Sequence, residues 1–200
     1  MSIDLTVALV SSIFTAIVGP IAVHLVKEKI DKSKKDILRE SISNNSLVTN
    51  KVEEIKDKTG ADRVWIVQFH NGGTFYPTGK SIQKFSMFYE SVSQGTNSIQ
   101  LNFQNIPISL FSKSINYLLE KSIIAVSDFE DESINTYDLK YIAEVHECKS
   151  QYLFAIKTIE GKFVGILGID FVKEPTYLLV DEVNHILVEA TSIGGVLNQK

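Results

Sequence analysis

Residues 151–172 read QYLFAIKTIEGKFVGILGIDFV, and this stretch decides the predicted fold. Two runs of apolar and β-branched residues flank Glu160-Gly161, a pair typical of the turn of a β-hairpin. Residues 181–197 follow, with apolar side chains at the three- and four-residue spacing of an amphipathic helix. The chain is therefore predicted to close with two antiparallel strands and a helix that packs beside them.

The residues upstream predict further strands and helices in alternation. HNGG at 70–73 is predicted to be a tight turn, and Ser109 is a candidate N-cap. The predicted strands are residues 63–69, 84–92 (which also fit a short helix) and 123–126, and the predicted helices are residues 108–122 and 135–149. This order predicts an α+β domain in which helices flank an antiparallel sheet.

The composition excludes several classes of function. The chain has 200 residues, 20 Lys and Arg against 24 Asp and Glu, and a formal net charge of −4. That length fits one domain plus an appendage. Nucleic-acid binding normally requires clustered basic residues, so no nucleic-acid partner is predicted. The single cysteine, Cys148, excludes an intramolecular disulfide and any multi-cysteine metal site.

An uncharged apolar run lies near the N-terminus. Leu5 to Val26 reads LTVALVSSIFTAIVGPIAVHLV, 22 residues without Asp, Glu, Lys or Arg. As a helix this run extends about 33 Å, enough for the roughly 30 Å apolar core of a bilayer. Lysines follow the run, so the positive-inside rule places the C-terminal side in the cytoplasm. Residues 1–26 are predicted to be a single-pass transmembrane anchor; a buried helix in an oligomer or a virion channel is the alternative.

The next segment, residues 27–43, is predicted to be a charged helical connector, because mixed charges accompany sparse apolar residues. SISNNS at 41–46 is expected to interrupt the helix. Two interpretations stay open: a coiled-coil stem for a homodimer, and a stalk that runs into the first helix of the globular domain. That domain is predicted over residues 44–200, with its first helix ending at Thr59-Gly60.

A glycine-containing strand near the C-terminus carries a family resemblance. Lys149-Ser150 leads into LFAIKTIEGKFVGILGIDF, and a closing helix begins near Val180-Asp181-Glu182. This order resembles a GAF domain, in which a strand of the form x-G-x-L-x-L-x-F and a terminal helix close the sheet. The resemblance covers about residues 44–198 and implies a cytoplasmic module that senses a ligand or dimerises. Residues 63–90 also resemble membrane-tethered GAF-like proteins encoded in bacteriophage genomes.

Departures from that family narrow what the resemblance implies. The Asn-Lys-x-Phe-Asp-Glu type signature of cyclic-nucleotide-binding members is missing from the sequence, and the methionine-sulfoxide reductases of this fold need more than one cysteine. Phytochrome-type members attach a bilin through a cysteine next to a histidine, whereas His146-Glu147-Cys148 reverses and separates that pair. The sequence contains no P-loop or dinucleotide fingerprint. We therefore predict no cofactor and no enzymatic activity.

Candidate ligand-binding residues gather around the HNGG segment. Paired glycines let a backbone approach a ligand, while histidine and asparagine supply donors and acceptors. Aromatic residues nearby suit the apolar lining of a pocket. The predicted ligand-binding residues are Gln68, His70, Asn71, Gly72, Gly73, Phe85 and Asp128, and no catalytic or metal-binding residue is predicted. The alternatives are a strand-ending turn, aromatics used for core packing, and a solvated acidic loop.

These observations leave several functions open. The first is a membrane-anchored, non-enzymatic GAF-like sensory or small-molecule-binding module that faces the cytoplasm. The alternative is a phage- or membrane-associated protein-interaction module with the same fold and no ligand, which dimerises through residues 27–58 and the terminal helix. A third hypothesis, an enzyme that uses His70 and Asp128 as acid and base, rests on residue types alone.

Overall fold

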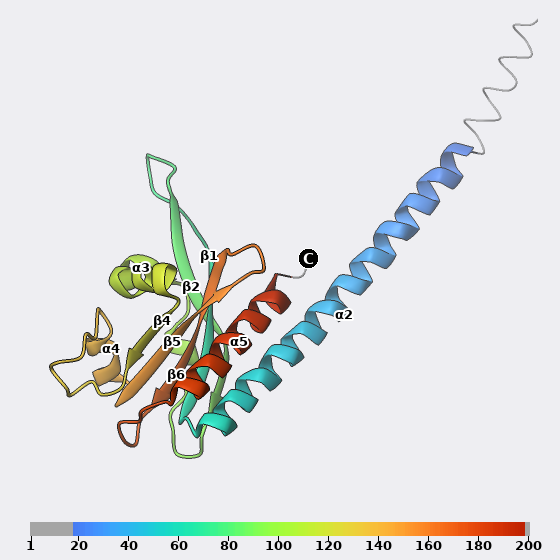
Figure 1. The fold of residues 1–200 in the computed structure, drawn as a ribbon. Coiled ribbons are helices and arrows are strands. Elements are labelled where there is room, and N and C mark those ends of the chain that lie inside the picture. The colour runs from blue at the N-terminus through green and yellow to red at the C-terminus, as the bar shows by residue number, and fades with distance from the viewer. Residues whose placement is uncertain (1–17, 199–200) are drawn as a thin grey trace, which may run out of the picture. The chain divides into compact units, whose positions relative to one another are not determined.

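One six-stranded antiparallel sheet organises the globular part of the chain in the computed structural model, which describes residues 18–198 (Figure 1). The strands lie in the order β3-β2-β1-β6-β5-β4. They are β1 (Arg63–Thr74), β2 (Ser81–Val92), β3 (Ile106–Pro107), β4 (Ile123–Val126), β5 (Ser150–Lys157) and β6 (Phe163–Phe171). Every neighbouring pair is antiparallel, which confirms the predicted sheet and places the first strand beside the last.

Helices cover both faces of this sheet. They are α2 (Gly19–Thr59), α3 (Ser112–Lys121), α4 (Lys140–Val145) and α5 (Val180–Leu197), with 3-10 turns at Gln100–Asn102 and Ile108–Phe111. The last turns of α2 and the whole of α5 lie against one face, and α3 and α4 lie against the other (Figure 1). The predicted α+β class is therefore confirmed.

The hairpin predicted from residues 151–172 is present. Strands β5 and β6 pair from Ser150 opposite Phe171 to Ile156 opposite Gly165. Between them the Gly161 N–H donates a hydrogen bond of 2.8 Å to the Thr158 carbonyl. The glycine turn and the β-branched runs thus set this part of the fold locally.

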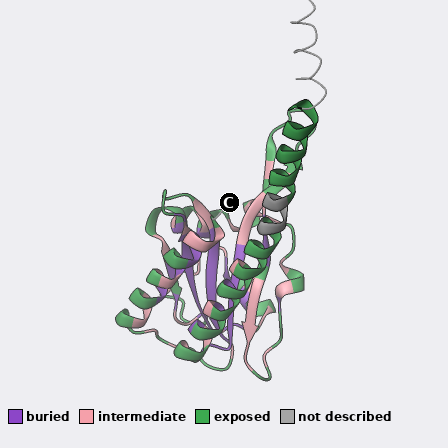
Figure 2. Cartoon of the chain, turned by 90° about the vertical axis from the view of Figure 1, so that its right-hand side faces the viewer, coloured by how far each residue is buried: buried purple, intermediate pink, exposed green. Residues whose placement is uncertain are grey.

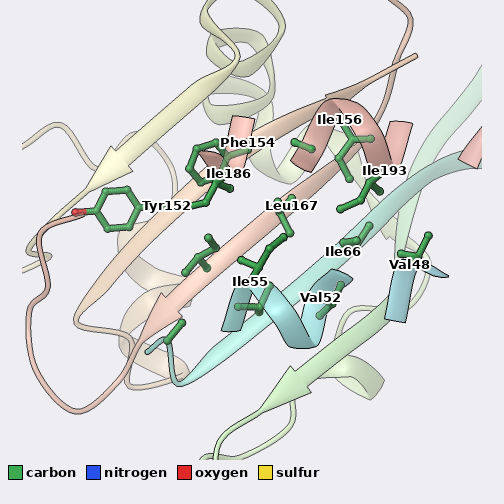
Figure 3. Close-up of a cluster of buried hydrophobic side chains, with 14 of the residues drawn as sticks. Val48, Val52, Ile55, Ile66, Tyr152, Phe154, Ile156, Leu167, Ile186 and Ile193 are labelled. Atoms are coloured by element: carbon green, nitrogen blue, oxygen red, sulfur yellow. The ribbon is translucent and has the colours of Figure 1, made fainter. Parts of the chain in front are cut away.

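The face under α2 and α5 is a closed apolar core. Residues 48, 52 and 55 of α2 and residues 186, 190 and 193 of α5 each follow a three- or four-residue spacing, which puts them on one side of their helix. Figure 3 shows these side chains meeting those of the central strands. Almost fully buried members of this core include Val48, Val52, Ile55, Ile66, Phe154, Leu167, Ile186 and Ile193.

The opposite face packs under α3 and α4. Side chains alternate along a strand, so Val64 and Ile66 face α2 and α5, whereas Trp65 and Val67 face α3 and α4. Figure 2 shows the strands as largely buried and the outer surfaces of the helices as exposed. The cavity that concerns function lies on this second face.

The prediction that HNGG forms a turn is wrong. Residues 70–73 continue β1, where His70 lies opposite Lys84 and Thr74 lies opposite Ser81. A glycine pair favours a turn because glycine adopts positive φ freely, and Gly73 does have a φ of 101°. A register shift between Asn71 and Thr74 accommodates Gly73 while β1 and β2 stay paired on both sides of it. The β1–β2 hairpin therefore extends further than the local pattern indicates.

The helix predicted over residues 135–149 is shorter than its apolar spacing indicates. Only Lys140–Val145 of residues 135–149 is helical, because positive φ values at Tyr137 and Glu147 interrupt the backbone on both sides. Residues 84–92, which also fit a helix, belong to β2.

The proposed cap at Ser109 is also wrong, since α3 begins at Ser112. The Asp138 carboxylate accepts hydrogen bonds from the backbone N–H groups of Lys113 and Ser114, at 2.8 and 3.1 Å. A residue about 25 positions later in the chain therefore satisfies the free N–H groups of this helix start, which a local capping pattern does not reveal.

The predicted break at residues 41–46 does not occur, because α2 is one continuous helix. Serine and asparagine cost well under 1 kcal/mol each in a helix, so a short polar run does not by itself end one. The helix ends at Thr59, and Gly60 follows with a φ of 66°, as predicted. The chain divides into two units, Met1–Asn45 and Ser46–Lys200. The predicted domain limits at residues 26 and 43 stay predictions.

The predicted membrane span, Leu5 to Val26, falls mainly outside the described residues. Only residues 18–26 of this run are described, and residues 19–26 form the start of α2. Within residues 18–198, no helix combines the length and the apolar character that crossing a bilayer requires.

Candidate functional site

A cavity of about 50 Å³ lies between the sheet and the helices α3 and α4. Most of its wall is apolar, with Val67 and Phe85 from the sheet, Ile115 from α3 and Ala143 from α4. Apolar walls with a few placed polar groups are the usual composition of a small-molecule site. Four of the polar side chains in the lining lie together on the sheet, while Ser114 belongs to α3 and His146 follows α4.

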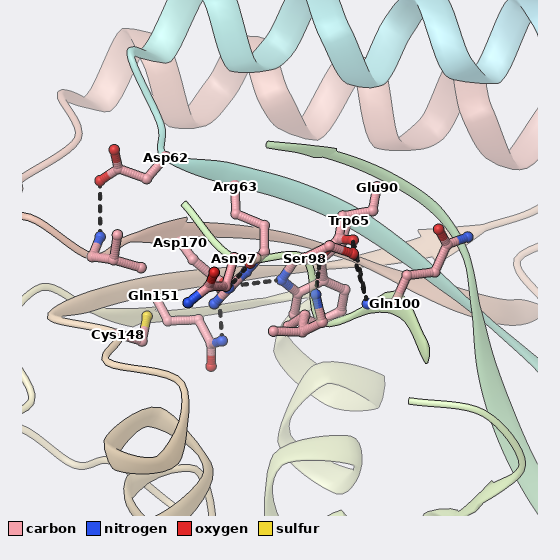
Figure 4. A network of polar contacts seen from close by, with 12 residues as sticks. Asp62, Arg63, Trp65, Glu90, Asn97, Ser98, Gln100, Cys148, Gln151 and Asp170 are labelled. Atoms are coloured by element: carbon pink, nitrogen blue, oxygen red, sulfur yellow. Dashed lines mark hydrogen bonds and ion pairs between the residues drawn. The ribbon is translucent and has the colours of Figure 1, made fainter. Parts of the chain in front are cut away.

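Four side chains from three adjacent strands form that polar floor (Figure 4). Asp170 accepts hydrogen bonds from Arg63 Nε at 2.7 Å, from Trp65 Nε1 at 2.9 Å and from Gln151 Nε2 at 2.9 Å. Arg63 is 2% exposed and Asp170 is 1% exposed. A buried ion pair is tolerated only when further hydrogen bonds satisfy its atoms, and this network provides them.

The strand register builds this network. Asp170 of β6 lies directly opposite Arg63 of β1 and directly opposite Gln151 of β5. Directly opposed residues on one face of a sheet have neighbouring side chains, so the three groups form one row across the strands. Arg63 Nη1 also donates to the Asn97 carbonyl at 3.1 Å, which ties the row to the loop after β2.

One polar atom of the floor has no partner among the described residues. Gln151 is 7% exposed, its Nε2 donates to Asp170, and its Oε1 is buried without a hydrogen bond. Figure 4 shows this oxygen on the side away from Asp170. A buried acceptor left unsatisfied costs about 1–3 kcal/mol, so such an atom in a cavity wall marks a place where a donor would bind.

A second, more polar cavity of about 200 Å³ shares Arg63, Ile99 and His146 with the first. Burial, and then the charge of Arg63, lowers the pKa of His146 below 6.5, so its ring is mainly neutral at pH 7. Thr96 also lines this second cavity, and its Oγ1 is buried without a hydrogen-bond partner in the described part of the chain. The two cavities together offer an apolar chamber beside a polar one.

Cys148 also lines the apolar cavity, but as a thiol. Burial, and then the negative charge of Asp170, raises its pKa well above the usual value. Its Sγ–H donates to the Ser150 carbonyl at 3.0 Å. A buried neutral thiol is a poor nucleophile, so the position of Cys148 favours packing over covalent chemistry.

The predicted ligand-binding residues do not come together. Phe85 lines the cavity. Gln68 and His70 alternate with Val67 along β1 and so lie on the opposite face of the sheet. His70 Nε2 lies 2.9 Å from the hydroxyl oxygen of Ser86.

The other predicted residues have local hydrogen bonds. Asn71 Oδ1 accepts from the Gly73 N–H and from the Ser81 hydroxyl, both at 3.0 Å, and Gly72 lies beside the Lys84 side chain. Asp128 Oδ1 accepts from the Glu130 N–H at 2.8 Å in the loop after β4. None of the residues in the HNGG segment lines the cavity under α3 and α4.

One feature of the sequence could have predicted two of the floor residues, Arg63 and Asp170. Arg63 begins the apolar run RVWIVQF, and Asp170 lies within the apolar run GILGIDF. A charged residue inside a strand buried on both faces must find an opposite charge, which predicts that these two pair. Gln151 gives no such signal, because its role depends on the register of β5 and β6.

The chemistry of the described residues does not extend to a metal site. In the part of the chain that the structure describes, no group of three or more His, Cys, Asp or Glu side chains is placed to hold a metal ion.

Comparison with known proteins establishes the fold. No family model matches this chain, and no curated protein matches its sequence. It is similar to a far-red cyanobacteriochrome photoreceptor, with a TM-score of 0.62 at 14% identity over 88% of this chain and 97% of the other. A phycocyanobilin-bound GAF domain from a cyanobacterial phytochrome gives a TM-score of 0.62 at 17% identity, over 85% and 92%.

A third structure, the blue-light absorbing form of the Thermosynechococcus elongatus PixJ GAF domain, gives a TM-score of 0.61 at 16% identity, over 80% of this chain and 88% of the other. At such identities the likeness shows the fold alone. The chain therefore has a GAF-like fold, which confirms the architecture that the resemblance implies.

Proposed function

We propose that this protein is a non-enzymatic sensory module that binds a small molecule in the cavity between the sheet and the helices α3 and α4. The observation that carries the proposal is Gln151 Oε1, a buried acceptor without a partner among residues 18–198, on a side chain that lines an apolar cavity. The fold adds support, because similar structures include a phycocyanobilin-bound GAF domain.

The ligand in this proposal is much smaller than a bilin. Pockets for drug-sized ligands hold about 300–1,000 Å³, whereas this cavity holds about 50 Å³. The buried, protonated state of Cys148 also disfavours a covalent link to a chromophore.

The proposal includes the membrane anchor. The apolar run Leu5 to Val26 and the lysines after it favour a single-pass anchor with the GAF-like domain in the cytoplasm. The resemblance of residues 63–90 to phage-encoded proteins remains a hypothesis about origin. Sodium carbonate extraction of membranes tests the anchor. If the anchor spans the membrane, the unmodified protein stays in the membrane pellet, and the double variant Leu9→Lys with Val10→Lys is released into the supernatant.

Native mass spectrometry of the protein purified from the expressing cells tests ligand binding. The proposal predicts a retained small molecule, and predicts that Ala143→Met loses it. Ala143 is 1% exposed and lines the cavity, so the longer side chain fills the space. Ala125→Met is the matched control, because Ala125 is exposed on β4. Equal retention by both variants would place the molecule elsewhere.

A specific observation also keeps the protein-interaction alternative open. In the first unit, α2 carries large apolar side chains that are about half exposed or more, including Ile21, Leu25, Ile30 and Leu38. Such side chains favour a second chain or lipid as a covering. Cross-linking in detergent distinguishes a second chain from lipid as the covering of α2. A homodimer requires cross-links between chains within residues 27–45, whereas a helix covered by lipid alone gives none.

A further inference from the structure

We infer that the molecule bound in this cavity is small, uncharged and largely apolar, and that it presents one N–H or O–H donor to Gln151 Oε1. The inference rests on the proposed function and narrows it to a class of ligand. It depends on the direction of one amide, on the charge balance of the floor, and on the size of the cavity.

The direction of the Gln151 amide follows from what Asp170 already does. Asp170 accepts from Arg63 Nε and Trp65 Nε1, so its carboxylate acts as an acceptor toward every neighbour. Only the NH₂ end of Gln151 can face that carboxylate, which it does at 2.9 Å. The oxygen must then face away from Asp170, as Figure 4 shows, and the Gln151 side chain that carries it lines the cavity. A ligand that offers only an acceptor would leave that acceptor and Gln151 Oε1 facing each other without a hydrogen bond. The ligand must therefore supply a donor.

The charge balance of the floor excludes an ionic ligand. Arg63 and Asp170 neutralise each other through a contact of 2.7 Å and are both almost fully buried. His146 also lines the cavity, and because burial lowers its pKa below 6.5 its ring is mainly neutral at pH 7. A charged ligand would lose its hydration without gaining a counter-charge, which costs several kcal/mol.

The size of the cavity limits the ligand to about one small ring. A buried water needs about 10–15 Å³ of this kind of space, so 50 Å³ holds about four waters, close to the bulk of a five-membered ring. A polar substituent has room in the adjoining cavity, where Thr96 Oγ1 has no partner.

Pyrrole and thiophene make a matched pair of probes, because the two rings are similar in size and only pyrrole carries an N–H donor. Calorimetric titration of the intact chain should show pyrrole binding about tenfold more tightly than thiophene, the difference of about one hydrogen bond. Pyrrolidine, a cation at pH 7, should not bind. In Gln151→Leu the preference for pyrrole should fall to about onefold.

The variants separate this inference from the proposed function. If Gln151→Leu fails to fold, Ala143→Met supplies the test, because filling the cavity should abolish binding of both probes. Equal affinity for pyrrole and thiophene in the unmodified protein, lost in Ala143→Met, would overturn the donor requirement and leave the cavity as a ligand site. Failure of both probes to bind, while a molecule is retained in native mass spectrometry, would overturn the ligand class. Failure of both with nothing retained would overturn the proposed function as well.

Discussion

Replacing Asp170 by asparagine should remove much of the stability of the GAF-like domain. The carboxylate accepts three hydrogen bonds, and one of its donors, Arg63, is 2% exposed and charged. Asparagine has one acceptor oxygen and must turn an NH₂ group toward a donor, while the guanidinium loses its counter-charge. Removing one partner of a buried ion pair costs about 3–5 kcal/mol. This loss is large against the roughly 5–15 kcal/mol by which domains are usually stable.

Urea unfolding followed by fluorescence measures this effect. The chain has one tryptophan, Trp65, and it donates to Asp170 itself, so its emission reports on the perturbed site. With a denaturant dependence of about 2 kcal/mol per M, the midpoint should fall by roughly 1.5–2.5 M.

Two further variants make the comparison specific. Glu130→Gln makes the same acid-to-amide change in an exposed partner of Lys149 and should leave the midpoint unchanged. The double variant Arg63→Met with Asp170→Leu should recover part of the loss, because no unpaired charge remains buried. A fall of less than about 0.5 M in Asp170→Asn would refute the reasoning that this ion pair is a buried and coupled network.

Three other expectations follow from single positions. Gly194→Ala should destabilise the protein by about 1–3 kcal/mol, because the new Cβ would lie 2.1 Å from the Lys157 carbonyl oxygen. Gly195→Ala should stabilise α5 by about 0.5–1 kcal/mol, because nothing lies within 4 Å of its Cβ. Thermal unfolding of both variants shows whether the two changes in stability have opposite signs. Cys148 should react with a thiol reagent at pH 8 only after unfolding, since burial raises its pKa, and equal rates in native and unfolded protein would contradict this. His146 should titrate below pH 6.5 in NMR spectra, because burial lowers its pKa. As the pH falls through 6.5 the unfolded chain takes up a proton that the folded state does not, so the folded state loses stability. His146→Gln should remove this loss.

The position of the cavity shows which residues of the β1–β2 hairpin belong to the candidate site and which do not. Phe85 lines the cavity, while His70 of the same hairpin contacts Ser86 and alternates onto the other face of the sheet. The period of two along residues 63–70 separates Trp65 and Val67 from Gln68 and His70, and the order of the amino acids alone is enough to predict this separation. Proximity in sequence to a glycine pair is therefore a weaker indicator of a site than the face on which a strand residue lies.

The closing hairpin, the strand at 123–126, the terminal helix and the end of the first helix at Thr59 could all be predicted, because turn residues, β-branched runs and helical spacing act over a few residues. The limits of α3 and α4 could not, since Asp138 caps α3 from a distant position and positive φ values at Tyr137 and Glu147 shorten α4. Local patterns do not carry such information.

By itself, the sequence determined the α+β class, the antiparallel hairpin at the C-terminus and the presence of two charged residues inside apolar strands. Only the tertiary structure decided that Arg63, Gln151 and Asp170 form one row, because that row depends on the register of three strands drawn from positions far apart in the chain. The tertiary structure also decided which polar atom is left over. Gln151 Oε1 is left over because the amide nitrogen of the same side chain already donates to Asp170, a consequence of packing that no local pattern contains.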